Sequence, residues 1–479
     1  MNKPLYLTTT LPYVNAKPHV GFALEIVQAD VIARFNRIIG REVFFNTGTD
    51  EHGQKVYEKA LELSKTPQEY VDELAPKFDD LKTALNLSYD KFIRTTDRFH
   101  IKAAQEIWRK CDENGDIYKK KYKGLYCVAC ERFVKEDELL DGRCPNHSTL
   151  DLEVLEEENY FFKFSKYQNE LLEYLDKEDV IIPDWRRIEA INFVKNGLED
   201  FSISRLKDKM PWGVPVPDDE SQVMYVWFEA LTNYISTLGW PDVGGDFKKF
   251  WLEGETIQFA GKDQVRFQSL MWQAMLLSAK IKTTDQVFYH GFVNVQGQKI
   301  SKSIGNVVDP VEIVEKIGTD ALRYQLLRHT SPVEDSNFSE DVLLENYNAG
   351  LANGLGNLFS RISKMAVSYE VAVGLPSKDE ILIGEDFANV SKYLKSFEFN
   401  KALDYLWVEF GALDSYIQES EPFKLIKTDE AKAKEIIAYL IIRLYELAVI
   451  LEPFLPNSSQ IITKTLESGE MPEPLFARI

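Results

Sequence analysis

Strand and helix patterns alternate at the start of the chain, and this alternation constrains the fold more than any other feature. Residues 5–10 have the composition of a strand, and residues 21–37 carry apolar side chains at helical spacing. A second strand pattern follows at 43–47, and a second helical pattern at 55–63. A helix that connects two strands of one sheet makes those strands parallel, so the sequence predicts an α/β fold with a parallel sheet.

Two loops follow the predicted strands, at 11–19 and 48–53. Ligands bind beyond the carboxyl ends of the strands in a parallel sheet. We therefore expect both loops to border one crevice, and we expect the active site to lie there.

Length and charge narrow the class of protein. A chain of 479 residues exceeds what one hydrophobic core organises, so about three units are expected. The formal net charge of −20 argues against a protein that coats nucleic acid indiscriminately. The lysines at 119–121 and 123 are a candidate for a local basic face, and an ordinary solvated surface is the alternative.

The sequence has no pattern typical of a targeting or membrane-spanning segment. Residues 1–6 lack a basic stretch followed by an apolar run, and the most apolar stretch, 438–455, is interrupted by Arg443, Glu446 and Glu452. We therefore expect a cytoplasmic protein without a membrane span. The cysteines suit a reducing compartment, because three of the four cluster in a way more typical of a metal site than of disulfides.

The clustered cysteines form a metal-ligand pattern. Cys127 and Cys130 are followed, after thirteen residues, by Cys144 and His147. Two such pairs on tight turns can close a tetrahedron around one Zn²⁺, and a closed site of this kind is structural. Free buried cysteines are the alternative. Cys111 lies outside the pattern and is predicted to be a core thiol.

Two further segments are suited to phosphate. His19 and Gly21 stand where a predicted helix begins, so exposed N–H groups and the helix dipole would attract an anion there. Far along the chain, Lys299, Ser301 and Lys302 lie in a polar loop that can hold a polyphosphate from the other side. The alternative for the second segment is a flexible basic surface loop.

Together, these two segments resemble the paired ATP motifs of class I aminoacyl-tRNA synthetases. The first reads His19-Val20-Gly21-Phe22 and the second Lys299-Ile300-Ser301-Lys302-Ser303. Other segments, in the order of the family, resemble methionyl-tRNA synthetases. These segments are 11–15, 47–53, 212–217, 225–230 and 261–263.

The resemblance implies both a reaction and a fold. Methionine would be activated with ATP and Mg²⁺ to methionyl-adenylate plus pyrophosphate, and then transferred to the 3′ end of initiator or elongator tRNA(Met). The fold would be a Rossmann-type parallel-sheet catalytic domain split by a zinc-binding connective insertion, followed by an α-helical bundle. The implied boundaries are 1–115 and 223–292 for the catalytic halves, 116–222 for the connective domain, 293–345 for the lysine-loop and stem-contact region, and 346–479 for the anticodon-binding domain.

The resemblance also implies roles for individual residues. The catalytic residues would be His19, Lys299 and Lys302. ATP would be bound by these three and by Gly21, Gly261, Asp263 and Ser301. Methionine would be bound by Leu11, Tyr13, Asp50, Trp227, Ala230, Tyr234 and Gln268, with Asp50 on the α-amino group. An aromatic pocket suits methionine because its thioether is polarisable and gains from ring contacts; ordinary core aromatics are the alternative.

Two positions depart from the family pattern. Phe22 stands where the first ATP motif normally has a second histidine, and a phenyl ring cannot donate the hydrogen bond of that histidine. Gln268 stands where a histidine normally lies near the methionine sulfur, and its amide can donate and accept but carries no charge.

Helical patterns dominate the last third of the chain, at 351–367, 400–419 and 429–451. The family reads its CAU anticodon with residues that match Asn353, Asn357, Arg361 and Phe423 here. Amide side chains and an aromatic ring can hydrogen-bond to and stack on unpaired bases. Ordinary solvation is the alternative for this polar stripe. No dimerisation domain follows, so a monomer is expected.

Three other functions compete with this interpretation. Class I synthetases for leucine, valine or isoleucine need a large editing insertion, for which about 110 residues between the catalytic halves leave no room. A cysteine-specific synthetase would use its zinc in the active site. An inert tRNA-binding paralogue would keep the fold while losing ATP residues, and Phe22 and Gln268 favour it, whereas His19, Asp263 and both lysines oppose it.

Overall fold

The structure is a computed structural model that describes residues 3–128, 132–134, 138–145, 150–295, 297–299 and 307–479. The chain divides into two compact units. The first unit consists of Met1–Pro18, Arg41–Asp80 and Tyr89–His290. The second unit consists of His19–Gly40, Leu81–Ser88 and Gly291–Ile479.

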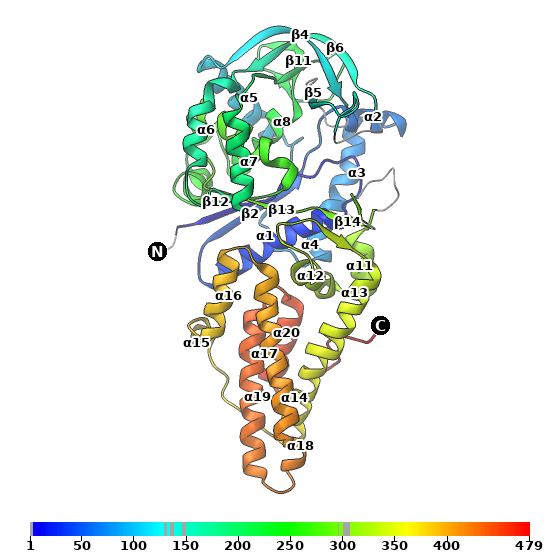
Figure 1. Cartoon of the computed structure of the whole chain (residues 1–479), viewed down its shortest axis with the longest axis vertical. Coiled ribbons are helices and arrows are strands. Elements are labelled where there is room, and N and C mark those ends of the chain that lie inside the picture. Colours follow the sequence, from blue (N-terminus) through cyan, green and yellow to red (C-terminus); the bar gives the residue numbers. More distant parts are fainter. Residues whose placement is uncertain (1–2, 129–131, 135–137, 146–149, 296, 300–306) are drawn as a thin grey trace. The chain divides into compact units, whose positions relative to one another are not determined.

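The first unit contains a six-stranded sheet (Figure 1). Every neighbouring pair in it runs parallel, which confirms the predicted parallel α/β fold. The strands, in order across the sheet, are β3 (Lys91–Arg94), β2 (Val43–Thr49), β1 (Leu5–Thr8), β12 (Glu255–Gly261), β13 (Gln286–His290) and β7 (Ile181–Ile182). All four residues of β1 are buried, as expected for a central strand covered on both faces.

Helices of the first unit bury large aromatic side chains together with the sheet. The core includes Tyr6, Phe228, Trp251 and Trp272. The α-helices are α2 (Gln54–Glu62), α3 (Pro67–Asp79), α5 (Arg98–Glu113), α6 (Gln168–Leu175), α7 (Asp184–Lys195), α8 (Val226–Ala230), α9 (Asn233–Ser236) and α10 (Trp272–Ser278). The 3₁₀ and π segments are η2 (Phe164–Tyr167), η3 (Phe247–Leu252), η4 (Lys262–Gln264) and η5 (Arg266–Met271).

Two smaller antiparallel sheets complete the first unit. One comprises β5 (Arg132–Val134), β4 (Ile117–Cys127), β6 (Glu153–Phe162) and β8 (Phe201–Ser202). The other comprises β10 (Pro215–Val216), β11 (Asp219–Met224) and β9 (Ser204–Leu206).

The lysine run of the sequence lies on β4, opposite acidic residues of β6. Lys121 and Lys123 are in register with Glu158 and Glu156. Lys119 donates to the Asp219 carboxylate at 2.7 Å. These acidic neighbours offset the charge of the run, which favours the solvated surface over a basic face.

The second unit is mainly helical, which confirms the predicted helical region (Figure 1). Its N-terminal segments are α1 (Val20–Ile38) and α4 (Leu81–Ala84), and its small sheet comprises β15 (Gln298–Lys299), β14 (Val293–Val295) and β16 (Ser336–Phe338). Its other helices are α11 (Pro310–Ile317), α12 (Thr319–Arg328), α13 (Glu340–Asn346), η6 (Tyr347–Gly356), α14 (Asn357–Ser368), α15 (Lys378–Leu382), α16 (Glu385–Lys395), α17 (Phe399–Ser420), α18 (Pro422–Leu425), α19 (Glu430–Leu451) and α20 (Pro456–Ser468).

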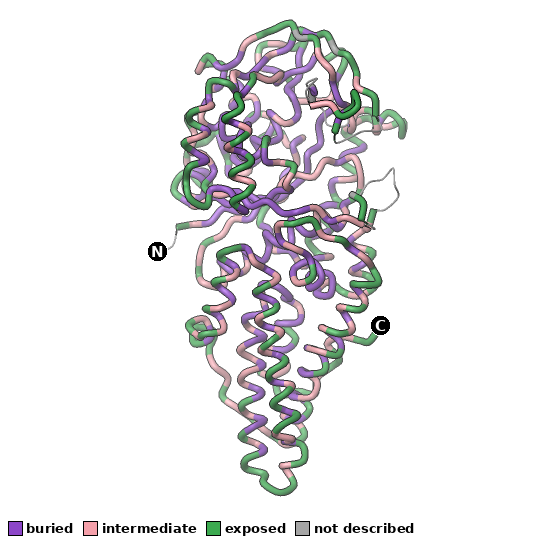
Figure 2. The backbone as a smooth tube through the Cα atoms, in the orientation of Figure 1, coloured by how far each residue is buried: buried purple, intermediate pink, exposed green. Residues whose placement is uncertain are grey.

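The helix predicted at 351–367 is two segments. It is π-helical in η6 up to Gly356 and α-helical from Asn357. Tyr324 packs closely against Gly350 of η6, because a Cβ at Gly350 would overlap the Tyr324 hydroxyl. Along α17 and α19, buried residues alternate with exposed ones at helical spacing (Figure 2). No helix in the described part of the chain combines the length and the hydrophobicity that a bilayer span requires.

Candidate active site

The two loops predicted to border one crevice lie against each other in the first unit. Tyr13 and Asp50 form an isolated parallel bridge. The Val14 N–H donates to the Asp50 carbonyl at 2.9 Å, and the Asp50 N–H donates to the Pro12 carbonyl at 3.0 Å. The loops follow neighbouring parallel strands, β1 and β2, so both leave the same edge of the sheet. The main chain thus places Asp50 beside Tyr13.

The residue after Asp50 anchors this loop. The Glu51 N–H donates to the Thr95 hydroxyl at 2.9 Å, and the Glu51 carboxylate accepts two bonds from Arg94, at 2.7 and 2.9 Å. Bidentate pairing of this kind fixes orientation as well as distance. Trp212 Nε1 donates to the Glu51 carbonyl at 2.6 Å. Asp50 itself is buried, on a loop held from both sides.

Helix α8, helix α9 and segment η5 contribute the predicted methionine side-chain contacts. Trp227 stacks on Phe267, with ring centroids 4.2 Å apart and an interplanar angle of 15°. The Tyr234 hydroxyl donates to Gln268 Oε1 at 3.0 Å, and both side chains are buried. Among the described residues, Gln268 Nε2 finds no acceptor. A buried donor of this kind is costly unless a ligand or water accepts from it.

The remaining predicted methionine residues have less specific surroundings. Ala230 is buried at the end of α8, and Leu11 is half-buried in the loop after β1. Phe267 was absent from the predicted set, although its ring pairs with Trp227. No local sequence pattern marks Phe267; in the structure it lies in η5, and short π-helical segments occur often at functional sites.

The predicted ribose-binding segment begins where β12 ends. Gly261 is in register with His290, and Asp263 follows in η4 as an exposed residue. A Cβ at Gly261 would lie 3.0 Å from Asp263 Oδ1. Glycine at this position therefore lets the Asp263 carboxylate lie close to the main chain. Because β12 neighbours β1 in the sheet, this segment also leaves the edge that carries the methionine loops.

In the second unit, His19 is the N-cap of α1. Its Nδ1 accepts a hydrogen bond from the Gly21 N–H at 3.1 Å, so the neutral ring carries its proton on Nε2. A Cβ at Gly21 would lie 2.9 Å from His19 Cε1. The first turn of α1 contains no acidic residue, which leaves the positive end of the helix dipole unneutralised by its own side chains. Phe22 is half-buried in this turn.

The second ATP segment is described only in part. The backbone of Lys299 pairs with Asn294 in β14 and β15. Ser301 and Lys302 lie outside the described residues, as does any contact that depends on them. The expected meeting of His19 with Lys302 therefore stays a prediction.

Two of the predicted zinc ligands share one small buried cluster. Cys127, at the end of β4, and Cys144 pack together with Val134. Cys130 and His147 lie outside the described residues, and no group of three or more metal-binding side chains gathers among the residues that are described. The two neighbouring buried thiols fit half of a zinc site.

Cys111 belongs to the main core of the first unit, as predicted. Its Sγ lies 3.9 Å from the carbonyl oxygen of Met275, to which the thiol donates a weak hydrogen bond. Burial raises the pKa of Cys111 to about 12, so the thiol stays protonated and unreactive at neutral pH.

The predicted anticodon residues lie in the helical region of the second unit. Asn353 on η6 and Asn357 at the start of α14 are both exposed. Arg361 is half-buried and forms an ion pair with Asp414 of α17. Phe423 on α18 is 39% exposed, which leaves much of its ring available for stacking.

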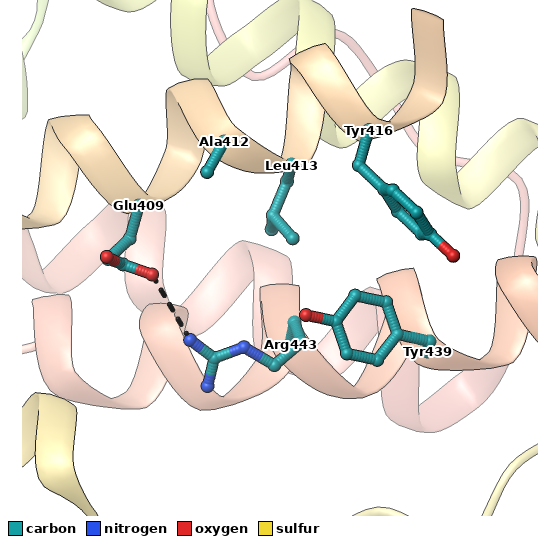
Figure 3. A pocket seen from close by; sticks show the side chains of 6 residues that line it. All are labelled: Glu409, Ala412, Leu413, Tyr416, Tyr439 and Arg443. Carbon is teal, nitrogen blue, oxygen red and sulfur yellow. Dashed lines mark hydrogen bonds and ion pairs between the residues drawn. The ribbon is translucent and has the colours of Figure 1, made fainter. Parts of the chain in front are cut away.

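A pocket of 360 Å³ lies between α17 and α19 (Figure 3). The Tyr416 and Tyr439 rings meet edge to face in it, 5.5 Å apart. Arg443 pairs there with Glu409 at 3.4 Å, and it also pairs with Asp386 and Glu446. These carboxylates neutralise the guanidinium, so it is poorly suited to phosphate. None of the residues that line the pocket belongs to the predicted site.

The fold and the site geometry define an α/β enzyme of the class I aminoacyl-tRNA synthetase type. Residues 5–153 and 148–363 match the family described as class I tRNA synthetases (M), and residues 378–475 match the anticodon binding domain of methionyl tRNA ligase. The chain therefore belongs to the methionyl-tRNA synthetase family.

Individual relatives are similar in sequence or structure to nearly the whole of this chain. The methionine–tRNA ligase of Fusobacterium nucleatum is 41% identical over 97% of this chain and 75% of its own length. That of Nostoc sp. is 40% identical over 98% of this chain and 90% of its own length. The structure of Mycobacterium tuberculosis methionyl-tRNA synthetase in complex with methionyl-adenylate superimposes with a TM-score of 0.92, at 35% identity, over 99% of this chain and all of that one.

Proposed function

We propose that this chain activates methionine with ATP, releases pyrophosphate, and transfers methionine from the adenylate to the 3′ end of tRNA(Met), both initiator and elongator. The activity is that of a methionine–tRNA ligase. The observation that carries this proposal is the 41% identity to a methionine–tRNA ligase over 97% of the chain. The contact between the Tyr13 loop and Asp50 supports it independently.

Asp50 would bind the α-amino group of methionine, and an aromatic wall would bind its side chain. A buried carboxylate beside the main chain of the Tyr13 loop is suited to an ammonium group. The stacked Trp227 and Phe267 rings offer a flat apolar surface, and thioethers gain from such contacts. Leu11, Ala230 and Tyr234 would complete the wall.

Gln268 would contribute polarity to this pocket. Its Oε1 accepts from Tyr234, which orients the amide so that Nε2 is the remaining donor. Since Nε2 donates to no acceptor among the described residues, it is suited to a weak acceptor such as the methionine sulfur.

The activation step forms one bond and breaks another. A methionine carboxylate oxygen attacks the α-phosphorus of ATP, and the bond from that phosphorus to the pyrophosphate oxygen breaks. His19 would donate from Nε2 to a phosphate oxygen, and Lys299 and Lys302 would stabilise charge that develops on the α-phosphate and pyrophosphate. Gly21, Gly261 and Ser301 would line the nucleotide, and Asp263 would hold the ribose. Mg²⁺ would enter and leave with the phosphates.

A structural Zn²⁺ would be held by Cys127, Cys130, Cys144 and His147. The shared burial of Cys127 and Cys144 supports this ligand set. Such an ion stabilises the fold and does no chemistry when four protein ligands close its coordination. Elemental analysis of fresh, chelator-free protein should give one zinc per chain, and its absence would rule out this site.

The anticodon of tRNA would bind the helical region of the second unit. Asn353, Asn357 and Phe423 are exposed and chemically suited to unpaired bases. Arg361 would take part only if its ion pair with Asp414 opened or was shared with the tRNA. We propose the domain boundaries given above, a monomer, and a cytoplasmic location, where Cys111, Cys127 and Cys144, which form no disulfide, would stay reduced.

Methionine-dependent ATP–pyrophosphate exchange tests the proposal directly. Exchange should depend on methionine and not on leucine, isoleucine, valine or cysteine. Lys302→Ala should slow it by roughly 100-fold or more, as the loss of a transition-state donor does. Tight tRNA binding without any amino-acid-dependent exchange would show an inert paralogue instead, and an unchanged Lys302→Ala rate would remove that lysine from catalysis.

A further inference from the structure

A fully buried carboxylate bridges two histidines beside the proposed methionine site. Glu229, on α8, has no solvent exposure. Its Oε1 lies 3.0 Å from His52 Nδ1, and its Oε2 lies 2.8 Å from His100 Nε2. His100 Nδ1 in turn lies 3.0 Å from the Ser236 hydroxyl. We refer to these four side chains, Glu229, His52, His100 and Ser236, as the Glu229 clamp.

The buried carboxylate determines which histidine nitrogens carry a proton. A carboxylate removed from solvent is strongly destabilised unless both of its oxygens accept hydrogen bonds, so each histidine presents a protonated nitrogen to Glu229. Burial raises the pKa of Glu229, but the charge of His52 and the hydrogen bonds from both histidines outweigh it and keep the pKa below its ordinary value. Glu229 is therefore an anion at neutral pH. The Ser236 hydroxyl can donate to His100 Nδ1, or accept from it and donate to the Asn233 carbonyl.

The clamp connects the parts of the chain that would hold the two ends of methionine. His52 is two residues beyond Asp50, on the loop whose backbone is bonded to the Tyr13 loop. Glu229 lies between Trp227 and Ala230 on α8. His100 bonds Glu229 to α5, whose Ile107 and Trp108 belong to the hydrophobic core. One carboxylate thus joins the amino-group loop to the side-chain wall.

We propose that Glu229 is a positioning residue that sets the separation between Asp50 and the wall formed by Trp227 and Ala230, and thereby selects the length of the amino-acid side chain. This inference rests on the proposed function, which assigns those three residues to methionine. Glu229 does not touch the substrate itself, because its two oxygens are occupied by His52 and His100. It acts through the elements that it holds together.

Glu229→Gln is the informative variant because it preserves the shape of the side chain. The amide nitrogen must donate to one ring, so that ring must present an unprotonated nitrogen to it, and the substitution removes the charge that draws both rings inward. The separation of the loop from α8 should then be less well defined. A pocket of poorly defined length loses discrimination between side chains that differ by one methylene.

This loss of discrimination can be measured with ethionine, whose side chain is one methylene longer than that of methionine. We compare kcat/KM for methionine with that for ethionine in ATP–pyrophosphate exchange. In Glu229→Gln the ratio should fall about fivefold or more, since one methylene accounts for a discrimination of order tenfold to 200-fold. The KM for methionine should rise, while the KM for ATP stays within about twofold.

Glu157→Gln is the matched control. Glu157 is also buried in the first unit, but its partners are Arg205, at 3.1 Å, Lys209 and Asn159, none of which belongs to α8. Its substitution should lower the melting temperature and leave the methionine-to-ethionine ratio unchanged. If Glu229→Gln does not fold, the ratio is measured in Glu229→Asp, which keeps the charge and should show a smaller fall of about twofold or more.

The outcomes separate this inference from the proposed function. A native chain without methionine-dependent exchange would overturn the proposed function, and the inference with it. A native chain that exchanges, together with a Glu229 variant that folds and keeps the native ratio, would overturn the inference alone. Equal losses of kcat/KM for methionine and ethionine would also overturn it, because they would indicate a general structural role.

Discussion

At the residue scale, glycine decides where other side chains can lie. Gly21 admits the His19 imidazole against the first turn of α1, and Gly261 admits the Asp263 carboxylate beside the end of β12. Neither glycine has the positive φ at which glycine is otherwise favoured. A Cβ at either position would displace the neighbouring side chain, and both positions lie in segments proposed to bind ATP.

Gly21→Ala tests this requirement. The new methyl group would lie 2.9 Å from His19 Cε1, so the imidazole must move and the bond from Gly21 N–H to Nδ1 must lengthen. We expect ATP–pyrophosphate exchange to fall roughly 100-fold, the order expected for a misplacement of about 1 Å.

Gly411→Ala is the control for Gly21→Ala. A Cβ at Gly411 meets nothing within 4 Å on helix α17. Exchange should stay at the native rate, and stability should rise by about 0.5–1 kcal/mol because alanine favours the helix. A Gly21→Ala enzyme with native activity would contradict the proposed role of His19.

Phe22→His tests the first departure from the family pattern. An imidazole in the first turn of α1 can donate to phosphate, which the phenyl ring cannot do. We therefore expect the rate of exchange to rise in this variant, with stability measured in parallel by thermal unfolding. A lower rate would indicate that the surroundings of Phe22 have adapted to an apolar ring.

At the element scale, short π-helical segments hold several of the residues proposed for the binding sites. Segment η5 presents Phe267 and Gln268, and segment η6 presents Asn353. A π-helical turn changes the angle between successive side chains, so residues four apart share a face less closely than in an α-helix. The stripe predicted from Asn353, Asn357 and Arg361 is therefore split between a π segment and an α-helix.

Asn357→Ala tests whether this face binds the anticodon. We expect kcat/KM for tRNA aminoacylation to fall roughly threefold to tenfold, the equivalent of one lost hydrogen bond. ATP–pyrophosphate exchange without tRNA should be unaffected. Gln460→Ala, an exposed amide on α20, is the control and should change neither rate. Unchanged aminoacylation in Asn357→Ala would mean that the face is merely solvated.

At the scale of the whole molecule, one buried ion pair holds distant segments of the second unit together. Arg323 of α12 pairs with Asp30 of α1 at 2.8 Å, and neither side chain is exposed. Arg323 also donates to the carbonyls of Leu85, Pro453 and Phe454. Burial lowers the pKa of Arg323, yet a guanidinium stays charged at any ordinary pH. The pair and its carbonyl contacts join four segments of the chain, near residues 30, 85, 323 and 454.

Asp30→Asn should destabilise the second unit by about 3–5 kcal/mol, because it leaves a buried guanidinium uncompensated. Hydrogen exchange of amides in α1 and α12 measures the loss locally. Glu398→Gln, which breaks an exposed pair with Lys401, is the control and should change stability by less than about 1 kcal/mol. Equal protection in Asp30→Asn and the native chain would contradict this role.

The effect of Asp30→Asn should depend on pH with a definite sign. Burial raises the pKa of Asp30, but the charges of Arg323 and Arg34 and a hydrogen bond from Ser88 outweigh it, so the pKa lies below its ordinary value. A group with a lowered folded-state pKa contributes stability above its unfolded pKa and loses it as the pH falls. The difference between native and variant should therefore be constant near neutrality and shrink below about pH 4.

The sequence by itself determined the local elements and their order. The patterns at 5–10, 21–37 and 43–47 correspond to β1, α1 and β2, and the helical patterns after 350 correspond to helices. Hydrophobic periodicity encodes which face of an element is buried, and the order of strand and helix encodes a parallel sheet. Both are properties of neighbouring residues, and a sequence displays them directly.

Only the tertiary structure decided which residues from distant segments meet. Glu229 contacts His52 and His100 across 177 and 129 residues, Trp227 stacks on Phe267, and Arg361 pairs with Asp414. None of these partners is marked by a local pattern, because a contact between elements depends on strand register and helix packing across the whole unit. In the sequence, a glutamate that the fold will bury cannot be distinguished from one that will lie on the surface.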